Sequence, residues 1–374
     1  MRAAFRRFVT EDLAPAFAPW LVARVVVVGA LALARYVFNE IGSGRRPGAL
    51  VDGLFAWDGQ HYRQIAELGY QGSPFGNVRF FPLYPLLGRG VGTVLAGHDD
   101  IGLLLVANLS ALIFGGLLHH VVMRETGDPV LARRSVWLGT LLPQMYMLVL
   151  GYSEATLMAL SVGAFLCLRS KQWWWAALLG ALAALARPPG MLLALPALIE
   201  AGRAWSGSKS RDRIASLGAV AGPVAGLALF LAWSANVYDD FLEPFRIQEV
   251  NGLRGGFVDP VTSLAHSLRQ LAHGDHLGAG AHILWAPIVI LFVIGAARRL
   301  PAAYTVYAIG VVLVALSSEN ISSFERYSMS AFPVIVGAAV ITERPRDLWP
   351  AALAISTAGL LGLSMLVFLG RFVP

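Results

Sequence analysis

Residues 101–122 read IGLLLVANLSALIFGGLLHHVV, an apolar stretch without a single acid, lysine or arginine. A helix of about 20 residues spans the ~30 Å hydrocarbon core of a bilayer, so this stretch is long enough to cross it. Four further blocks are also long and apolar: residues 20–38 (which include Arg24 and Arg35), 214–235, 283–297 (somewhat short) and 348–369. Charged residues make up only 14% of the chain and mean hydropathy is +0.62, whereas soluble domains contain about 25% charged residues. We therefore predict an all-α, polytopic membrane protein.

Clusters of arginine and lysine set the expected orientation, because positive charge marks the cytoplasmic side of a membrane protein. Placing every cluster inside predicts about eleven spans, with the N-terminus cytoplasmic and the C-terminus outside. The net charge of +6 is then loop charge, and nucleic acid is not an expected partner. The clusters are Arg2/Arg6/Arg7, Arg124/Arg133/Arg134, Arg169/Lys171, Arg203/Lys209/Arg211/Arg213, Arg298/Arg299 and Arg344/Arg346. The expected spans run near 17–38, 101–123, 134–150, 152–168, 173–186, 188–201, 214–236, 282–298, 300–316, 328–342 and 350–370.

With the spans placed in this way, three extracytoplasmic loops remain, at about 39–100, 237–281 and 317–327, and most of the acids lie in them. Residues 1–374 are expected to form a single transmembrane domain whose loops carry the functional site. The helices between 134 and 201 are short, and short helices are expected to line a cavity or a thinned region of the bilayer.

The first of these loops contains the sequence WDGQHYRQIAELGY at residues 57–70. We expect a helix here that Gly69 closes as a C-cap. Asp58 is open to two interpretations. It is either a reactive carboxylate or the N-cap of this helix, with Trp57 and Tyr62 as the flanking hydrophobic staple.

Three other motifs carry candidate residues. RFFPLYPLL at residues 79–87 reads as an interfacial or re-entrant segment. In ARPPG at 186–190, a proline can begin a helix and place Arg187 beside its N-terminus, which together would bind phosphate. A snorkelling arginine is the alternative, but an arginine outside the membrane runs against the positive-inside rule and favours a functional role. Glu325 and Arg326 on the third loop are open to the same two interpretations.

The histidines of the second loop do not form a recognisable metal site. His266, His273, His276 and His282 fit no zinc-binding spacing, and we expect them to be solvated loop residues. The single cysteine, Cys167, lies in an apolar segment and offers no thiolate cluster.

The motifs of the first loop, WDGQHY, then IAELGY and then FFPLYPLL, resemble the first luminal loop of the PIG-V mannosyltransferases, members of the GT-C superfamily. ARPPG is similar to that family's Arg-Pro-x-Gly turn. DDFLEPFRIQ at residues 239–248 is similar to its Asp-Pro-x-x-Phe…Gln stretch, although the proline comes late here. ERY…FP at residues 325–333 is similar to its last signature, and the order of the motifs is kept across almost the whole chain.

The resemblance implies a GT-C-like bundle in the cytoplasmic membrane. It also implies inverting transfer of mannose from a polyprenyl-phosphate-mannose donor to a lipid-linked glycan or another acceptor, on the extracytoplasmic face. Membrane lipids would be further partners. Asp58 would be the catalytic base, and the substrate-binding residues would be His61, Arg63, Arg79, Arg187, Gln248, Glu325 and Arg326. Many GT-C enzymes carry an acidic pair in this loop, whereas Asp58 has no neighbouring acid. No metal ligand is therefore assigned, and a divalent cation is left open.

Two alternatives compete with this interpretation. A transporter or flippase for a polyprenyl-linked sugar would carry ionisable residues near the bilayer midplane, on interrupted helices. Mid-span charges are few here (Arg24, Arg35 and Glu154), and the acids gather in the outer loops, which favours chemistry at the interface. The other alternative is a GT-C enzyme that uses a different sugar.

Overall fold

The computed structural model describes residues 8–207, 209–250, 253–274, 279–343 and 348–372. All regular elements among these residues are helical and none is a strand, which confirms the all-α prediction. Among the residues used above, Arg2, Arg6, Arg7, His276, Arg344 and Arg346 lie outside the described ranges.

Five segments of the described chain are long and apolar enough to cross a bilayer, and each overlaps one of the apolar blocks. This confirms a multi-pass architecture, while eleven spans and the orientation stay predictions. Four of these segments are the long helices α2 (Ala14–Ile41, preceded by the π-helical turn η1, Phe8–Leu13), α6 (Asp99–Thr126), α11 (Ser210–Tyr238) and α18 (Leu348–Phe368). The fifth, Gly280–Ala297, joins the end of the 3₁₀ segment η7 to the shorter helix α14 (Trp285–Ala297).

Shorter helices fill the bundle between them, as expected for the region 134–201. At 14 residues, α9 is about 21 Å long, which is less than the thickness of the hydrocarbon core. The span expected at 134–150 is corrected, because α7 ends at Leu141 and a 3₁₀ segment begins at Pro143, which cannot continue an α-helix. The short elements are α7 (Pro129–Leu141), η4 (Pro143–Leu148), α8 (Glu154–Arg169), α9 (Trp173–Ala186), η5 (Pro188–Leu193), α10 (Ala194–Trp205), α15 (Ala302–Leu316) and α17 (Phe332–Ile341).

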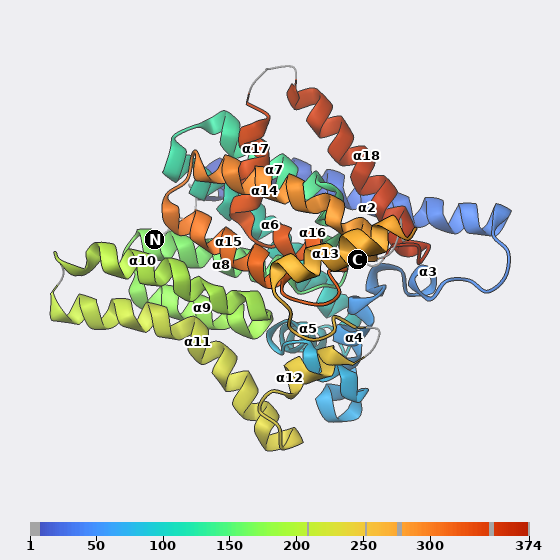
Figure 1. Cartoon of the computed structure of the whole chain (residues 1–374), viewed down its shortest axis with the longest axis horizontal. Helices are drawn as coiled ribbons and strands as arrows, with labels where there is room; N and C mark the ends of the chain where they lie inside the picture. Colours follow the sequence, from blue (N-terminus) through green and yellow to red (C-terminus); the bar gives the residue numbers. More distant parts are fainter. Residues whose placement is uncertain (1–7, 208, 251–252, 275–278, 344–347, 373–374) are drawn as a thin grey trace.

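Small residues let these helices approach closely. A Cβ atom at Gly222 or Gly226 of α11 would overlap the backbone of α9 at Ala177 or Ala181. The four-residue spacing puts both glycines on one face of α11, the pattern that membrane helices use for backbone contact. Figure 1 shows α9, α10 and α11 side by side at one end of the molecule.

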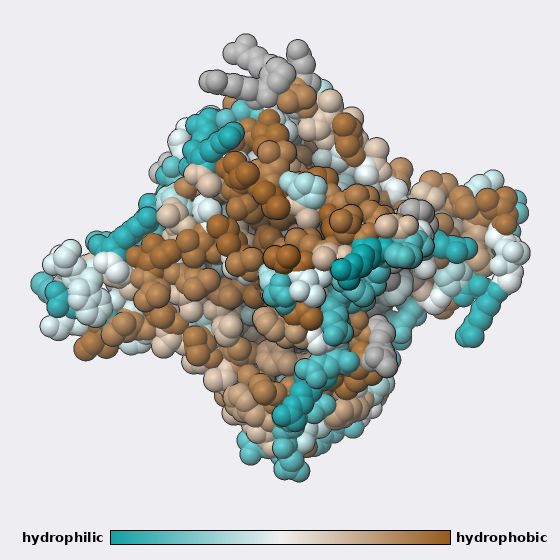
Figure 2. Space-filling model, in the orientation of Figure 1, coloured by the Kyte–Doolittle hydropathy of each residue, from teal (hydrophilic) through white to brown (hydrophobic). Residues whose placement is uncertain are grey.

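The outer surface of the bundle is apolar. Figure 2 shows brown side chains over α9, α11, α14 and α15, with hydrophilic side chains at the edges of the view and in a band that runs from α13 to its lower end. Val25, Leu229 and Ile355 on three of the long helices are 65, 62 and 70% exposed. Such an exposed apolar surface is what a hydrocarbon solvent requires.

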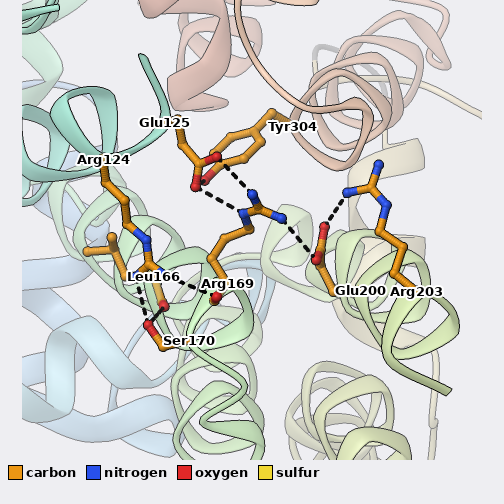
Figure 3. A network of polar contacts seen from close by, with 8 residues as sticks. All are labelled: Arg124, Glu125, Leu166, Arg169, Ser170, Glu200, Arg203 and Tyr304. Atoms are coloured by element: carbon orange, nitrogen blue, oxygen red, sulfur yellow. Dashed lines mark hydrogen bonds and ion pairs between the residues drawn. The ribbon is translucent and has the colours of Figure 1, made fainter. Parts of the chain in front are cut away.

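A network of ion pairs ties four helices together (Figure 3). Arg169, at the end of α8, holds both oxygens of Glu125 on α6 at 3.0 and 3.1 Å, and its third nitrogen lies 3.2 Å from Glu200 on α10. Tyr304 of α15 donates to the same Glu125 at 3.1 Å, and Arg203 holds Glu200 from within α10 at 2.7 Å. Arg169 is therefore a structural tie and not a free loop charge.

The predicted outer loops consist of short helices packed against the bundle. Gly69, with φ +72°, interrupts the helix α4 as expected, although helical turns continue to Gly72. The first loop contains α3 (Gly48–Asp52), η2 (Gly53–Phe55), α4 (Asp58–Gly72), η3 (Phe75–Arg79) and α5 (Leu83–Val94). The second contains α12 (Glu243–Arg246), η6 (Ile247–Glu249), α13 (Pro260–Ala272) and η7 (Ala279–Leu284), and the third contains α16 (Phe324–Met329).

Candidate active site

Two adjoining cavities open where the three predicted outer loops meet. Cavity A, of about 120 Å³, lies between the first loop and Arg187. Cavity B, of about 350 Å³, lies between the first loop and α16. Both are lined by Asp58, Arg79, Gln248, Arg254 and Tyr327, so these residues form their common wall.

Asp58 is the carboxylate in that wall. Helix α4 begins at Asp58, Trp57 occupies the N-cap position, and no side chain caps the helix end. The carboxylate instead accepts a bond of 2.7 Å from Arg326, and the side chain is 24% exposed to the cavities. The N-cap interpretation is thus wrong, and the staple with it, because Trp57 is itself the N-cap and a staple would join the residue before it to His61. Tyr62 is buried and bonds Ser153 at 2.6 Å.

The electrostatics of Asp58 follow from its neighbours. Burial alone would raise the pKa of the carboxyl, but Arg326, together with Arg187 and His61, holds it below the ordinary value. Trp57, just before it, has a φ of +58°. A bulky residue seldom adopts this left-handed conformation, and such strain is typical of functional sites. The indole of Trp57 donates to the carbonyl of Val367 at 3.0 Å, which anchors this turn on α18.

Behind the common wall lies Glu154, the first residue of α8, which is fully buried. Its carboxylate is 2.6 Å from Arg187 and 3.5 Å from Arg326. Arg187 also donates to Ser153 at 3.3 Å. A single buried acid therefore positions both arginines that the sequence nominated.

Arginines outnumber acids around the cavities. The ring of Tyr327 lies beneath Arg187, Arg254 and Arg326, with guanidinium carbons 5.3, 4.6 and 4.9 Å from its centre. Arg79 adds a fourth positive charge, against the carboxylates of Asp58 and Glu154. The wall thus carries excess positive charge in a partly enclosed space, where a phosphate group would be strongly attracted.

Of the other nominated residues, His61, Arg79 and Gln248 line the cavities, and Arg63 does not. His61 Nδ1 is 2.7 Å from Asn77 Oδ1 and its ring stacks on Phe80, while burial lowers its pKa, which favours the neutral imidazole. Arg63 is exposed and pairs with Glu67, one turn along α4, at 3.3 Å.

Glu325 lies in a second buried pair and lines neither cavity. Its Oε2 is 2.7 Å from Nδ1 of His282, and both side chains are fully buried. The expectation that His282 is a solvated loop residue is therefore wrong, because the loop folds inward onto α16. The expected place of Arg187 is confirmed, with one difference: Pro188 begins a 3₁₀ segment, η5, which has Arg187 at its N-cap and continues directly into α10, so the first turns of this helix are 3₁₀ and not α-helical.

Sequence reasoning missed Glu154, Arg254 and Tyr327 as parts of the site. Glu154 did give a signal, since an acid within an apolar segment is costly unless it is paired. Arg254 gave none, because its contacts are with Ala315 and Ser318, some sixty residues away.

The described residues do not bring together three or more histidines, cysteines or acids as a metal site would need. Asp58 is paired with a guanidinium and Glu154 with two. The donor set around the cavities does not fit a divalent cation, and no chemical step is assigned to one.

No model of a protein family matches the chain, and no curated protein matches it either. Solved structures do resemble it. The apo oligosaccharyltransferase of Archaeoglobus fulgidus is similar with a TM-score of 0.52 and 14% identity, over 96% of this chain and 56% of that one. The same archaeal enzyme with an inhibitory peptide and a dolichol-phosphate has a TM-score of 0.48 and 11% identity, over 96% and 56% of the two chains. Its complex with zinc and sulfate has a TM-score of 0.48 and 14% identity, over 93% and 53%.

The similarity to the apo enzyme confirms the expected GT-C-like fold class. The present chain spans little more than half the length of that protein. At 14% identity the likeness extends to the fold alone, and function has to be argued from the cavities themselves.

Proposed function

We propose that this protein is a GT-C glycosyltransferase that moves a sugar from a polyprenyl-phosphate donor to a hydroxyl of its acceptor, with Asp58 as general base. The observation that carries the proposal is the charge distribution around cavities A and B. A partly exposed carboxylate in their common wall lies among four arginines that line one cavity or both, at the junction of three loops.

The charges suit this reaction. As the bond between the anomeric carbon and the phosphate oxygen breaks, the leaving polyprenyl phosphate keeps the electron pair. Arg187, Arg254 and Arg326 would stabilise that developing charge. The acceptor oxygen forms the new bond and gives its proton to Asp58. One base and direct displacement predict inversion at the anomeric carbon.

The ion pair between Asp58 and Arg326 supplies a way to activate the base. A phosphate bound beside Arg326 would compete with Asp58 for the same guanidinium. Losing that partner raises the pKa of a carboxylate and makes it a stronger proton acceptor. The base would thus reach full strength when the donor is in place.

One wall of cavity A suits a lipid. Pro188 and Pro189 on one side face Val311, Val314 and Ala315 of α15 on the other. Val314 is 46% exposed on the surface of the bundle, so this wall continues onto the face that lipid would cover. A prenyl chain could leave the cavity along it while its phosphate stays with the arginines.

The finer assignments rest on the sequence. Mannose as the sugar and a lipid-linked glycan as acceptor follow from the PIG-V resemblance. An extracytoplasmic site in the cytoplasmic membrane follows from the arginine distribution, which places all three contributing loops outside.

The test uses purified protein in nanodiscs, given radiolabelled polyprenyl-phosphate-mannose and a lipid extract of the source organism, with and without EDTA. The wild type should transfer label, and Asp58→Asn should transfer it about 10²–10⁴-fold more slowly, as expected for loss of a general base. Chelation should leave the rate unchanged.

Glu67→Gln is the matched control, because Glu67 lies exposed on the same helix and lines neither cavity. It should retain full activity. Transfer that survives Asp58→Asn in a folded protein would remove Asp58 from the mechanism. No transfer from any polyprenyl-linked sugar by the wild type would refute the proposal and favour a transporter.

A further inference from the structure

A third cavity, which we call cavity C, lies beside cavity B. It has a volume of about 540 Å³, and its wall includes Arg45, Asp52, Gln60 and Arg371. Trp57 and His61 line both cavity C and cavity B. Cavity C therefore adjoins the proposed active site and contains none of its arginines.

Cavity C opens at a membrane surface. Two long helices end at its rim: α2 at Ile41, followed by Ser43 in the wall, and α18 at Phe368, followed by Leu369. Since both helices can span a bilayer, the residues that follow their ends, and cavity C with them, lie toward one surface of the membrane. Figure 1 shows the end of α18 beside α2 and α3.

Exposed apolar side chains lie on the segments that form cavity C. Ile41 and Val51, each within two residues of a lining residue, are 81% and 62% exposed. These side chains would lie against acyl chains and not against water. A ligand anchored in the bilayer can thus reach cavity C without leaving the membrane surface.

The wall of cavity C is cationic. Arg45 and Arg371 face one acid, Asp52, which already accepts a hydrogen bond from Gln60. Gly370, with φ +67°, lies two residues beyond the end of α18 and close to Pro47, which brings Arg371 next to the loop that carries Arg45. Two arginines from segments more than 300 residues apart thus meet in one wall, an arrangement suited to an anion.

The neighbouring polar groups suit a polyol. Asp52 and Gln60 offer hydrogen-bond acceptors and donors, and the ring of Trp57 lies between them and cavity B. Aromatic faces with adjacent polar groups bind sugar-like hydroxylated groups well.

We propose that cavity C binds the phosphate group of the acceptor, held by Arg45 and Arg371, so that an acceptor hydroxyl extends past Trp57 and His61 to Asp58. This inference rests on the proposed function, because the bound phosphate compound is an acceptor only if the protein transfers a sugar. Donor and acceptor then approach Asp58 from opposite sides, each with its own arginines. The position of cavity C at the membrane surface favours a phospholipid headgroup over a water-soluble phosphate.

The experiment measures binding without transfer. Purified full-length protein in an uncharged detergent is titrated calorimetrically with dioctanoyl phosphatidylglycerol, with dioctanoylglycerol (which lacks phosphate) and with glycerol 3-phosphate. The variants are Arg45→Gln/Arg371→Gln and the matched control Arg46→Gln. Arg46 is the next residue along, does not line cavity C and bonds Asn39.

Phosphatidylglycerol should bind the wild type and Arg46→Gln with equal Kd. The Kd of the double variant should rise about tenfold, because two exposed charge contacts are lost. Dioctanoylglycerol should bind much more weakly than phosphatidylglycerol. Weak binding of glycerol 3-phosphate would identify the ligand as a lipid headgroup. Equal binding with the same dependence on the arginines would support the phosphate site and assign it to a soluble acceptor.

Equal affinities in all three proteins, or equal binding of the lipid without phosphate, would overturn the inference. Asp58→Asn should bind phosphatidylglycerol normally, because Asp58 does not line cavity C. If the wild type shows arginine-dependent binding but no transfer, the proposed function fails while the phosphate site stands.

Discussion

The substitution Glu154→Gln removes the negative charge that lies between two buried arginines. Glu154 is fully buried, 2.6 Å from Arg187 and 3.5 Å from Arg326, and both of these side chains are at most 10% exposed. Removing one partner of a buried ion pair leaves its counterpart as an uncompensated charge, which typically costs 3–5 kcal/mol. Glutamine keeps the size of the side chain and one acceptor oxygen, so we expect the lower end, about 3 kcal/mol of unfolding free energy.

The assay uses the single cysteine, Cys167, which is partly buried in α8. Its reaction with a thiol dye during a dodecyl sulfate titration reports unfolding of the same helix that Glu154 begins. Glu67→Gln is the control, since the same chemical change at an exposed ion pair should cost less than about 0.5 kcal/mol. A double-mutant cycle with Arg187→Gln tests the pairing directly. The double variant should be more stable than the sum of the single effects predicts, by about 1–3 kcal/mol.

Two results would refute this reasoning. Stability of Glu154→Gln within about 0.5 kcal/mol of the wild type would mean that no buried charge depends on Glu154. Strictly additive effects in the cycle would mean that Glu154 and Arg187 do not interact, and the arrangement of the arginines in cavity A would need another cause.

Two further predictions concern the pH dependence of Asp58 and the ion-pair network of Arg169. Because Arg326 lowers the pKa of Asp58, the contribution of this pair to stability is present above the unfolded-state pKa and is lost as pH falls through the folded-state pKa. On the acid side, the pH at which kcat/KM falls to half should accordingly lie below the usual range of aspartate pKa values. Arg326→Gln should move this midpoint to higher pH. The same midpoint in both proteins would contradict the pairing. Arg169→Met should lower the free energy of unfolding by about 2 kcal/mol. Glu125 and Glu200 are nearly buried, and the substitution removes the arginine that pairs with both of them. Acceptor and donor KM should not change, and a KM effect without loss of stability would show that this network reaches the cavities.

Local pattern predicted the architecture well. Each of the five apolar blocks became a helix capable of crossing a bilayer, since hydrophobicity and length alone decide where such helices form. The prediction of a span failed where a proline interrupts an apolar segment, as Pro143 does in the span expected at 134–150. The three loops that line cavities A and B lie outside the five blocks, and their extracytoplasmic position stays a prediction.

The sequence by itself determined that this is an all-helical membrane protein and singled out Asp58, Arg187 and Arg326. Only the tertiary structure decided how they act together. Asp58 and Arg326 are 268 positions apart, and the distinction between a helix cap and an ion-paired carboxylate depends on that contact. Local sequence records helix periodicity and apolar length, because neighbouring residues set them. The partner of a buried charge is chosen by how the helices pack, as Glu154 shows for its two arginines and Glu325 for His282.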